Sequence, residues 1–312
     1  MNVFEAVIQG AVQGLTEFLP VSSSGHLSLS QHVLGVQSNN LFFDVMLHLG
    51  TLLAVFAVYY KLIFRLIGAF FSIIGEVFTG KFSWRRMNND KRMVIMIIIG
   101  LLPLFCLFLP VPGTGMSIKD VTSKWSEEGN ILVVGIALIA TSVLLAIGIF
   151  LSKRNTVVHM AGKHSKVTYG KKSLNTIDAI SVGFAQFVAA AVPGLSRSGS
   201  TLSVGLMKGI DKQAALDYSF ILGMPAIIAA GLLEFKEAME LPGFSIDVLP
   251  VVVGVIVSAV VGFLAIKLFK WLLATDKMSI FVWYTLIVGS ATIIISIIEH
   301  KTGVNLFTGA AL

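Results

Sequence analysis

Long apolar runs, separated by short polar connections, make up most of the chain. A helix that crosses a bilayer needs about 20 predominantly apolar residues, because the hydrocarbon core is about 30 Å thick. Six runs have this length, and we expect each to span the membrane as a helix: 42–60, 92–110, 130–151, 214–233, 247–269 and 280–298. The pattern therefore predicts an all-α integral membrane protein with six transmembrane helices.

Two further apolar regions, 3–34 and 174–207, are interrupted near their centres by Pro, Gly and Ser. Broken backbone at membrane depth is tolerated only where protein or a water-filled cavity covers it. We expect each region to form a re-entrant helix–loop–helix hairpin that enters and leaves on the same side. The segment 62–79 is amphipathic, with Arg65 and Glu76, and we expect it to lie along the membrane surface.

Composition agrees with this class of protein. Of the 312 residues, 55% are hydrophobic and 13% are charged, whereas soluble domains carry about 25% charged residues. We expect one polytopic membrane domain over residues 1–312. Met1 to Gln9 contains no Lys or Arg and no cleavage site follows, so the first segment is expected to belong to the fold. A single cysteine, Cys106, excludes an internal disulfide and a cysteine-based metal site.

The charged residues predict the orientation. Lys and Arg are concentrated in the connections 61–92, 152–173 and 267–277, whereas 111–129 and 234–247 carry mainly acidic residues. The positive-inside rule places the first three in the cytoplasm and the last two outside. The net charge of +6 is therefore a topology signal and a contact for anionic membrane lipids. We expect no nucleic-acid partner, since no basic patch is interleaved with aromatic residues.

The two interrupted regions belong to an internal repeat. Residues of the same type recur at a constant spacing of 173: Gln13 and Gln186, Pro20 and Pro193, Ser23 and Ser196, Asp44 and Asp217, Gly50 and Gly223. The repeats cover about 1–60 and 174–233. Given the predicted orientation, the first hairpin enters from outside and the second from the cytoplasm. Such an inverted-topology repeat places its ligand where the broken helices meet, near the membrane midplane.

Polar groups gather at both breaks. Gln13 to His26 reads QGLTEFLPVSSSGH, and Pro193 to Thr201 reads PGLSRSGST. Helix N-termini bind anions, and the guanidinium of Arg197 matches phosphate oxygens. We therefore predict a phosphate site that also contains an ionisable group, Glu17. The residues expected to bind the substrate phosphates are Ser22, Ser24, Gly25, Ser196, Ser198, Gly199 and Thr201.

Structural roles compete with these predictions. A serine that precedes a helix is usually an N-cap, and Glu17 and Arg197 can form a purely structural ion pair. We expect His48 to be a hydrogen-bonded core residue. Asp44 and Asp217 are expected as N-caps where spans begin. The remaining candidates, His159, His164 and His300, are expected to be solvated loop residues.

The two break motifs, together with FDVMLHLGTLLAV at Phe43 to Val55 and the segment from Asp217 to Pro225, resemble the undecaprenyl-diphosphate phosphatase family of bacteria. This family is also called the bacitracin-resistance proteins, BacA or UppP, and the similarity runs through most of the chain. The resemblance implies an enzyme of the bacterial cell membrane. It would remove the terminal phosphate of a C55 isoprenoid diphosphate and return the monophosphate carrier lipid to peptidoglycan synthesis.

The resemblance also implies roles for residues. Gln13 and Glu17 fall on an acidic motif tied to a divalent cation, Mg²⁺ or Ca²⁺, and to acid–base chemistry. Ser23 and His26 fall on the proposed nucleophile and proton-transfer residues, and Arg197 on the phosphate-binding arginine. Because a Gln side chain cannot take a proton, Glu17 is the stronger candidate for the general base. Attack on phosphorus by Ser23, by His26 or directly by water stays open.

The main alternative is a transporter or flippase of the polyprenyl phosphate carrier lipid. Inverted repeats with broken helices are typical of transporters, and moving a phosphate head group also needs an anion site. The feature that favours an enzyme is the group formed by Glu17, Ser23 and His26, since transport needs no nucleophile and base. The sequence leaves a homodimer open.

Overall fold

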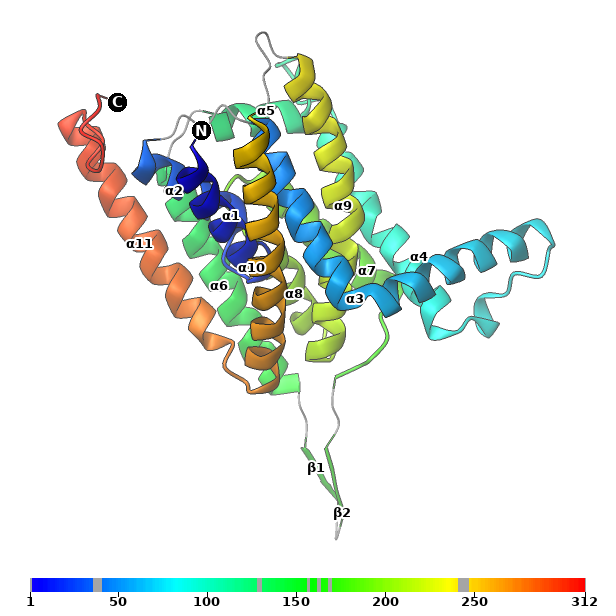
Figure 1. The fold of residues 1–312 in the computed structure, drawn as a ribbon. Coiled ribbons are helices and arrows are strands. Elements are labelled where there is room, and N and C mark those ends of the chain that lie inside the picture. Colours follow the sequence, from blue (N-terminus) through cyan, green and yellow to red (C-terminus); the bar gives the residue numbers. More distant parts are fainter. Residues whose placement is uncertain are drawn as a thin grey trace.

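A computed structural model describes residues 2–35, 41–127, 131–155, 158–161, 164–167, 170–240 and 247–311. These residues form a bundle that is almost entirely helical (Figure 1). The α-helices are α1 (Val3–Phe18), α2 (Ser23–Leu34), α3 (Leu41–Phe78), α4 (Asn89–Leu101), α5 (Ile118–Glu127), α6 (Ile131–Asn155), α7 (Thr176–Ala191), α8 (Arg197–Met207), α9 (Lys212–Glu240), α10 (Val248–Ala274) and α11 (Ser279–Thr302). Two 3₁₀ helices are η1 (Trp84–Arg86) and η2 (Leu102–Phe108).

The six predicted spans are confirmed. Within the described residues, six helices are long and apolar enough to cross a membrane: Phe42–Phe78, Asn89–Phe108, Ile131–Lys153, Lys212–Glu237, Val248–Ala274 and Ser279–Thr302. Each corresponds to one predicted run, although residue 130 of the third run lies outside the described part of the chain. The protein is a multi-pass membrane protein. Its main core cluster draws side chains from α1, α3, α4 and every helix from α6 to α11.

The predicted surface segment 62–79 is not a separate element. It is the second part of α3, which continues without a break to Phe78. Figure 1 shows this part projecting sideways from the bundle, where it runs beside the start of α4. Its position along the membrane surface stays a prediction.

The predicted span 92–110 changes helix type halfway. The α-helix α4 ends at Leu101, and the chain continues as the 3₁₀ helix η2. Pro103 explains the change, because proline has no N–H to donate and its ring clashes with the carbonyl four residues earlier. Side chains of η2 contribute to the lining of the cavity described below.

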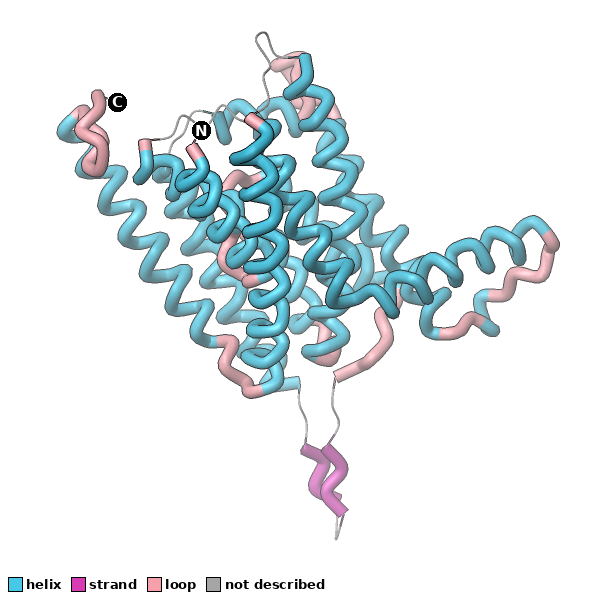
Figure 2. The backbone as a smooth tube through the Cα atoms, in the orientation of Figure 1, coloured by secondary structure: helices cyan, strands magenta, loops and turns pink. Residues whose placement is uncertain are grey.

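A small β-hairpin modifies the all-α prediction. The strands β1 (Val158–Ala161) and β2 (His164–Val167) pair antiparallel and extend from one end of the bundle (Figure 2, magenta). His159 and His164 therefore lie in strands, and the expectation of loop residues is wrong for both. His300 is exposed as expected, but it lies in the last turn of α11 rather than in a loop.

The two predicted aspartate caps are also wrong. Asp44 lies inside the first turn of α3, and Asp217 lies inside α9, which already begins at Lys212. Asp217 instead accepts hydrogen bonds from the Tyr59 hydroxyl at 2.7 Å and from the Gln213 amide at 2.8 Å. Its carboxylate therefore joins α3 to α9.

Both interrupted regions fold as helix–break–helix. The helices α1 and α7 each contain 16 residues, and each begins with an asparagine capping box, formed by Asn2 or Asn175. Each is followed by proline. A residue before proline is driven out of the α region, and Leu19 and Val192 accordingly have extended backbones, with ψ of 145° and 105°. The prolines thus set where the first helix of each region ends.

Glycines let the first helix of each region approach a neighbour closely. A Cβ at Gly10 of α1 would lie 2.7 Å from the carbonyl oxygen of Gly254 in α10. A Cβ at Gly183 of α7 would lie 2.2 Å from the carbonyl oxygen of Gly100 in α4. Small residues are the usual means of close helix packing in membranes, so these glycines determine how near α1 and α7 come to their partners.

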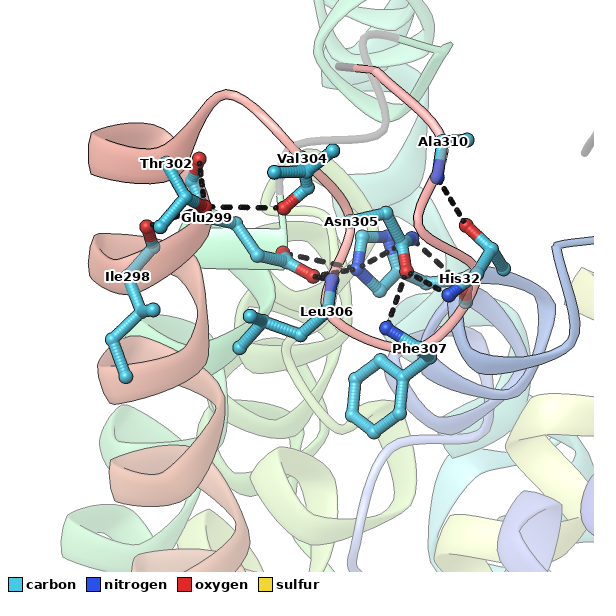
Figure 3. A network of polar contacts seen from close by, with 10 residues as sticks. His32, Ile298, Glu299, Thr302, Val304, Asn305, Leu306, Phe307 and Ala310 are labelled. Atoms are coloured by element: carbon cyan, nitrogen blue, oxygen red, sulfur yellow. Dashed lines mark hydrogen bonds and ion pairs between the residues drawn. The ribbon is translucent and has the colours of Figure 1, made fainter.

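The C-terminal segment fastens α11 to α2 (Figure 3). Glu299, which is almost fully buried, lies 2.9 Å from the His32 Nε2 atom and accepts a hydrogen bond from the Leu306 N–H. The Asn305 amide donates to the carbonyl oxygen of His32 at 3.2 Å. The C-terminal end of α2 is therefore held by a segment outside its own helix–break–helix region.

Candidate active site

The two breaks meet inside the bundle. The Ser198 hydroxyl at the start of α8 donates to the carbonyl oxygen of Leu19 in the first break, at 3.1 Å. A Cβ at Gly25 of α2 would lie 3.6 Å from the Cα of Gly194 in the second break. Beside this contact is a cavity of about 460 Å³, lined by residues of both breaks. Its ionisable and hydroxyl-bearing lining residues are Glu17, Ser22, Ser23, Ser24, His48, Lys119, Thr122, Ser123, Ser196, Arg197, Ser198 and Glu234.

Glu17 is the centre of the polar contacts. Its carboxylate is buried, and its Oε1 atom accepts a hydrogen bond from Arg197 Nη2 at 2.8 Å. Its Oε2 atom accepts from the Ser23 hydroxyl at 2.7 Å and from the Gln13 amide at 3.0 Å. A carboxylate within hydrogen-bond reach of a hydroxyl, and oriented by other groups, is the arrangement of a general base with its nucleophile.

Arg197 keeps one side of its guanidinium unpaired. Nη2 is bonded to Glu17, whereas Nη1 is buried and has no hydrogen-bond partner among the described residues. The guanidinium packs directly on α9 at Gly223, where a Cβ would lie only 1.8 Å from Nη1. Two sequence features pointed to Gly223: its match to Gly50 in the repeat, and its place in the segment from Asp217 to Pro225 that resembles the family.

Two of the serines at the breaks cap helices, and two others present their hydroxyls to the cavity. Ser22 and Ser196 are N-caps, and they accept hydrogen bonds from the N–H groups of Gly25 at 3.2 Å and Gly199 at 3.0 Å. Ser22 also adopts a positive φ of 74°, which is uncommon for a residue with a side chain and typical of functional sites. Among the other hydroxyls, Ser23 and Ser24 face the cavity from the first turn of α2.

Three predicted phosphate-binding residues lie behind the cavity wall. Gly25 and Gly199 are not among the lining residues, and their N–H groups are used by the caps. The Thr201 hydroxyl donates to the carbonyl oxygen of Arg197 at 2.9 Å and bonds to Ser219 of α9. These residues hold the ends of α2 and α8 rather than face the cavity.

The positions of His26 and His48 relative to the cavity are the reverse of what the sequence predicts. His26 does not line the cavity: its Nδ1 lies 2.8 Å from the Ser22 carbonyl oxygen, and its Nε2 lies 2.8 Å from the Tyr284 hydroxyl of α11. His48 does line it, and its Nε2 lies 3.7 Å from Glu17 Oε2. Sequence reasoning treated His48 as a core residue, although it lies within the motif at Phe43 to Val55.

The polar groups partly fit a divalent cation. Gln13 Oε1 is a buried acceptor with no partner in the described chain, and it belongs to the amide that contacts Glu17. Among the described residues, no group of three or more His, Cys, Asp or Glu side chains could hold a metal ion. Mg²⁺ is commonly bound through one or two carboxylates plus substrate phosphates. Glu17 lines the cavity, whereas Gln13 is buried and is not among the lining residues. The fit is therefore to a cation bound jointly by Glu17 and a phosphate, with Gln13 as an additional oxygen ligand.

Most of the remaining lining is apolar. These apolar side chains, the apolar wall, come from η2, α7 and α9 and include Leu104, Leu107, Phe108, Ala189, Val192, Ile227, Ala230 and Leu233, and the same helices also contribute Gln186 and Glu234. The helix α5 lies at the same cavity through Lys119, which forms an ion pair with Glu237 of α9. A cavity that combines charged groups with a mainly apolar lining fits an amphiphile that carries an anionic head group.

Comparison with known proteins agrees with this geometry. The family model described as bacitracin resistance protein BacA matches residues 6–291. This chain belongs to the BacA family. It is 36% identical over 302 residues to the undecaprenyl-diphosphatase of Alkaliphilus metalliredigens, covering 96% of this chain and 100% of that protein.

Other BacA relatives are similar over the same length. The undecaprenyl-diphosphatase of Methanosphaera stadtmanae is 36% identical, with 96% of this chain and 99% of that protein covered. The undecaprenyl-diphosphatase of Bacteroides fragilis is 32% identical, with coverage of 95% and 99%. The resemblance inferred from the two break motifs is confirmed.

Proposed function

We propose that this BacA-family protein hydrolyses undecaprenyl diphosphate to undecaprenyl phosphate and inorganic phosphate. The relatives named undecaprenyl-diphosphatase align with it over almost their whole length. The single observation that carries the proposal is the Glu17 carboxylate, which contacts Ser23 and Arg197 in a cavity with an apolar wall. The phosphates bind beside Ser23 and Arg197, and the isoprenoid lies along the apolar wall.

The phosphate end combines two sources of positive potential. Arg197 supplies a guanidinium, whose unpaired Nη1 can donate to a phosphate oxygen. The N-termini of α2 and α8 face the same cavity, and helix N-termini favour anions. The hydroxyl of Ser24 lines the cavity as a further donor. Together these groups stabilise the charge that develops on the transferred phosphoryl group.

The chemical step uses Ser23 as the nucleophile. Its Oγ forms a bond to the terminal phosphorus, the bond between that phosphorus and the bridging oxygen breaks, and undecaprenyl phosphate leaves. The Ser23 proton passes to Glu17, whose Oε2 lies 2.7 Å from the hydroxyl oxygen. Water then attacks the phosphoserine, Ser23 leaves with a proton returned through Glu17, and inorganic phosphate is released.

A divalent cation, Mg²⁺ or Ca²⁺, would be held by the Glu17 carboxylate and Gln13 Oε1 together with phosphate oxygens. It would supply charge neutralisation on the diphosphate. Gln13 also orients the carboxylate directly, since its Nε2 donates to Glu17 Oε2 at 3.0 Å.

The test is phosphate release by the purified protein from undecaprenyl diphosphate with Mg²⁺ or Ca²⁺. Wild-type protein should release phosphate, and Ser23→Ala should not. Rapid quenching with ³²P-labelled substrate should trap label on Ser23. Label on a histidine would identify that histidine as the nucleophile. Turnover without any covalent label would support direct attack by water.

We further propose that the two helix–break–helix regions are re-entrant hairpins of an inverted-topology repeat. The start points of α1 and α7, Val3 and Thr176, are separated by the same 173 residues as the sequence matches. In Figure 1, α1 starts at the end of the bundle where the N-terminus lies, whereas α7 follows the β-hairpin at the other end. These features support opposite insertion of the two hairpins.

Single cysteines placed in a Cys106→Ser background test this arrangement. Cysteines at Val3 and Val33, the two ends of the first hairpin, should react with an impermeant thiol reagent from outside the cell. Cysteines at Lys172 and Lys208 should react only from the cytoplasmic side. Labelling of the two ends of one hairpin from opposite faces would contradict the proposal.

The transporter alternative has no support from the described contacts, because Glu17 and Ser23 form a base–hydroxyl pair that transport does not need. Movement of the lipid across vesicles without phosphate release would nevertheless establish it. A homodimer stays a prediction, and crosslinking in native membranes is the measurement that tests it.

A further inference from the structure

Gln186 of α7 is a buried polar side chain at the cavity. It is 1% exposed, and neither its Oε1 nor its Nε2 atom has a hydrogen-bond partner among the described residues. Its side chain lines the cavity together with Arg197 and Ala190. A buried amide that makes no hydrogen bond is costly in the free protein, because it has lost water without compensation.

The first repeat shows what the equivalent amide does when it has an acceptor. Gln13 is the counterpart of Gln186, and its Nε2 donates to Glu17 one helical turn later, at 3.0 Å. In α7 the residue one turn after Gln186 is Ala190, which has no polar side chain. Gln186 therefore occupies the position equivalent to Gln13, but the side chain one turn after it cannot accept a hydrogen bond as Glu17 does.

Two of the unpaired groups at this cavity are hydrogen-bond donors. Gln186 Nε2 and Arg197 Nη1 are both buried donors without acceptors among the described residues, and both side chains line the same cavity. Two unsatisfied donors at one cavity are complementary to an anion that brings several acceptor oxygens. A diphosphate head group has these oxygens.

We propose that Gln186 contacts the substrate directly, with its Nε2 donating to a phosphate oxygen of the diphosphate. This inference rests on the proposed phosphatase function and adds a substrate-binding residue from the second repeat. Binding of substrate gives the two donors, Gln186 Nε2 and Arg197 Nη1, their acceptors together. Burying these donors without acceptors costs free energy in the free protein. Substrate binding relieves this cost, which increases the affinity for the phosphates.

The size-matched variant Gln186→Leu separates this role from a structural one. We expect kcat/KM to fall by about 10- to 100-fold, the effect of losing one hydrogen bond to a charged group. Thermal stability of the free protein should be unchanged or higher, since an unpaired buried amide is replaced by an apolar group. Gln186→Glu should reduce kcat/KM at least as much, because a carboxylate repels the phosphates.

The matched control is Gln9→Leu in α1. Gln9 is also buried and has an unpaired Nε2, but it does not line the cavity. Its Oε1 accepts from Ser30, which keeps a second bond to the Leu27 carbonyl oxygen. Gln9→Leu should leave kcat/KM near the wild-type value.

A binding experiment keeps this inference separate from the phosphatase assay. Inorganic phosphate should raise the unfolding temperature of wild-type protein and of Gln9→Leu, since a ligand stabilises the state that binds it. The shift should be smaller or absent in Gln186→Leu. Full kcat/KM together with a full phosphate shift in Gln186→Leu would overturn the inference. If wild-type protein released no phosphate from the lipid, the proposed function would fail, and the shift alone would still decide whether Gln186 binds phosphate.

Discussion

Arg197 Nη2 donates to Glu17 Oε1 at 2.8 Å, across 180 residues of sequence. This contact joins the first helix of one interrupted region to the second helix of the other. It differs from a closed structural ion pair, because Arg197 Nη1 has no partner in the described chain and both side chains line the cavity. The pair therefore connects the two halves of the bundle and also offers a free donor to a ligand.

Arg197→Lys should separate charge from geometry. Lysine keeps the positive charge but lacks the planar fork, so it cannot bond Glu17 and a phosphate oxygen in the same way. We expect kcat/KM for phosphate release to fall by about 10²-fold or more, comparable to the loss of one donor to a developing oxyanion. Membrane insertion and the elution volume in detergent should stay unchanged. Turnover near the wild-type level would argue that Arg197 is structural.

Gly223→Ala should disturb the site from the neighbouring helix. The added methyl group would lie 1.8 Å from Arg197 Nη1, so the guanidinium must move. We expect at least a tenfold loss of kcat/KM, since small displacements of a positioned group reduce rates strongly. The control is Gly68→Ala in α3, where nothing lies within 4 Å of the added Cβ. Equal activity of the two variants would contradict the assigned position of Arg197.

His48 and His26 can be compared directly by substitution with asparagine. His48 Nε2 lies 3.7 Å from Glu17 Oε2, whereas His26 is bonded to the Ser22 backbone and to Tyr284. We expect His48→Asn to lower kcat by about tenfold or more, in the range of lost acid–base assistance. His26→Asn should act mainly by loosening the start of α2, which would appear as a lower unfolding temperature. A larger kcat effect at His26, without loss of stability, would favour the role that the family resemblance implies for it.

Glu299→Ala should destabilise the protein without touching the cavity. Removal of the Glu299 carboxylate would leave the His32 ring and the Leu306 N–H without this hydrogen-bond acceptor, which costs about 1 to 3 kcal/mol for each buried group left unsatisfied. His32, the Leu306 N–H and the end of α2 would lose their contact (Figure 3). The expected result is a lower unfolding temperature and faster amide exchange in residues 303–311. The exposed pair of Lys236 and Glu240 gives the control, since Lys236→Ala should change stability by less than about 1 kcal/mol.

Much of the architecture follows from local features. Runs of about 20 apolar residues mark the spans, and Pro20 and Pro193 mark where α1 and α7 end, because proline acts on its own neighbours. The same local rule should have placed the change from α4 to η2, where Pro103 lies inside a predicted span. The span prediction missed this change of helix type, because hydropathy depends only on which residues are present and is the same for an α-helix and a 3₁₀ helix.

The sequence by itself determined the six spans, the two broken regions, the family and the presence of a carboxylate, a hydroxyl and a guanidinium at the breaks. Only the tertiary structure decided that Glu17 contacts Ser23 and Arg197, that His48 rather than His26 faces the cavity, and that Gln186 is unpaired. The physical reason is that helix type and membrane length depend on neighbouring residues. Contacts within a site depend instead on the rotation and depth of helices that are far apart in the chain.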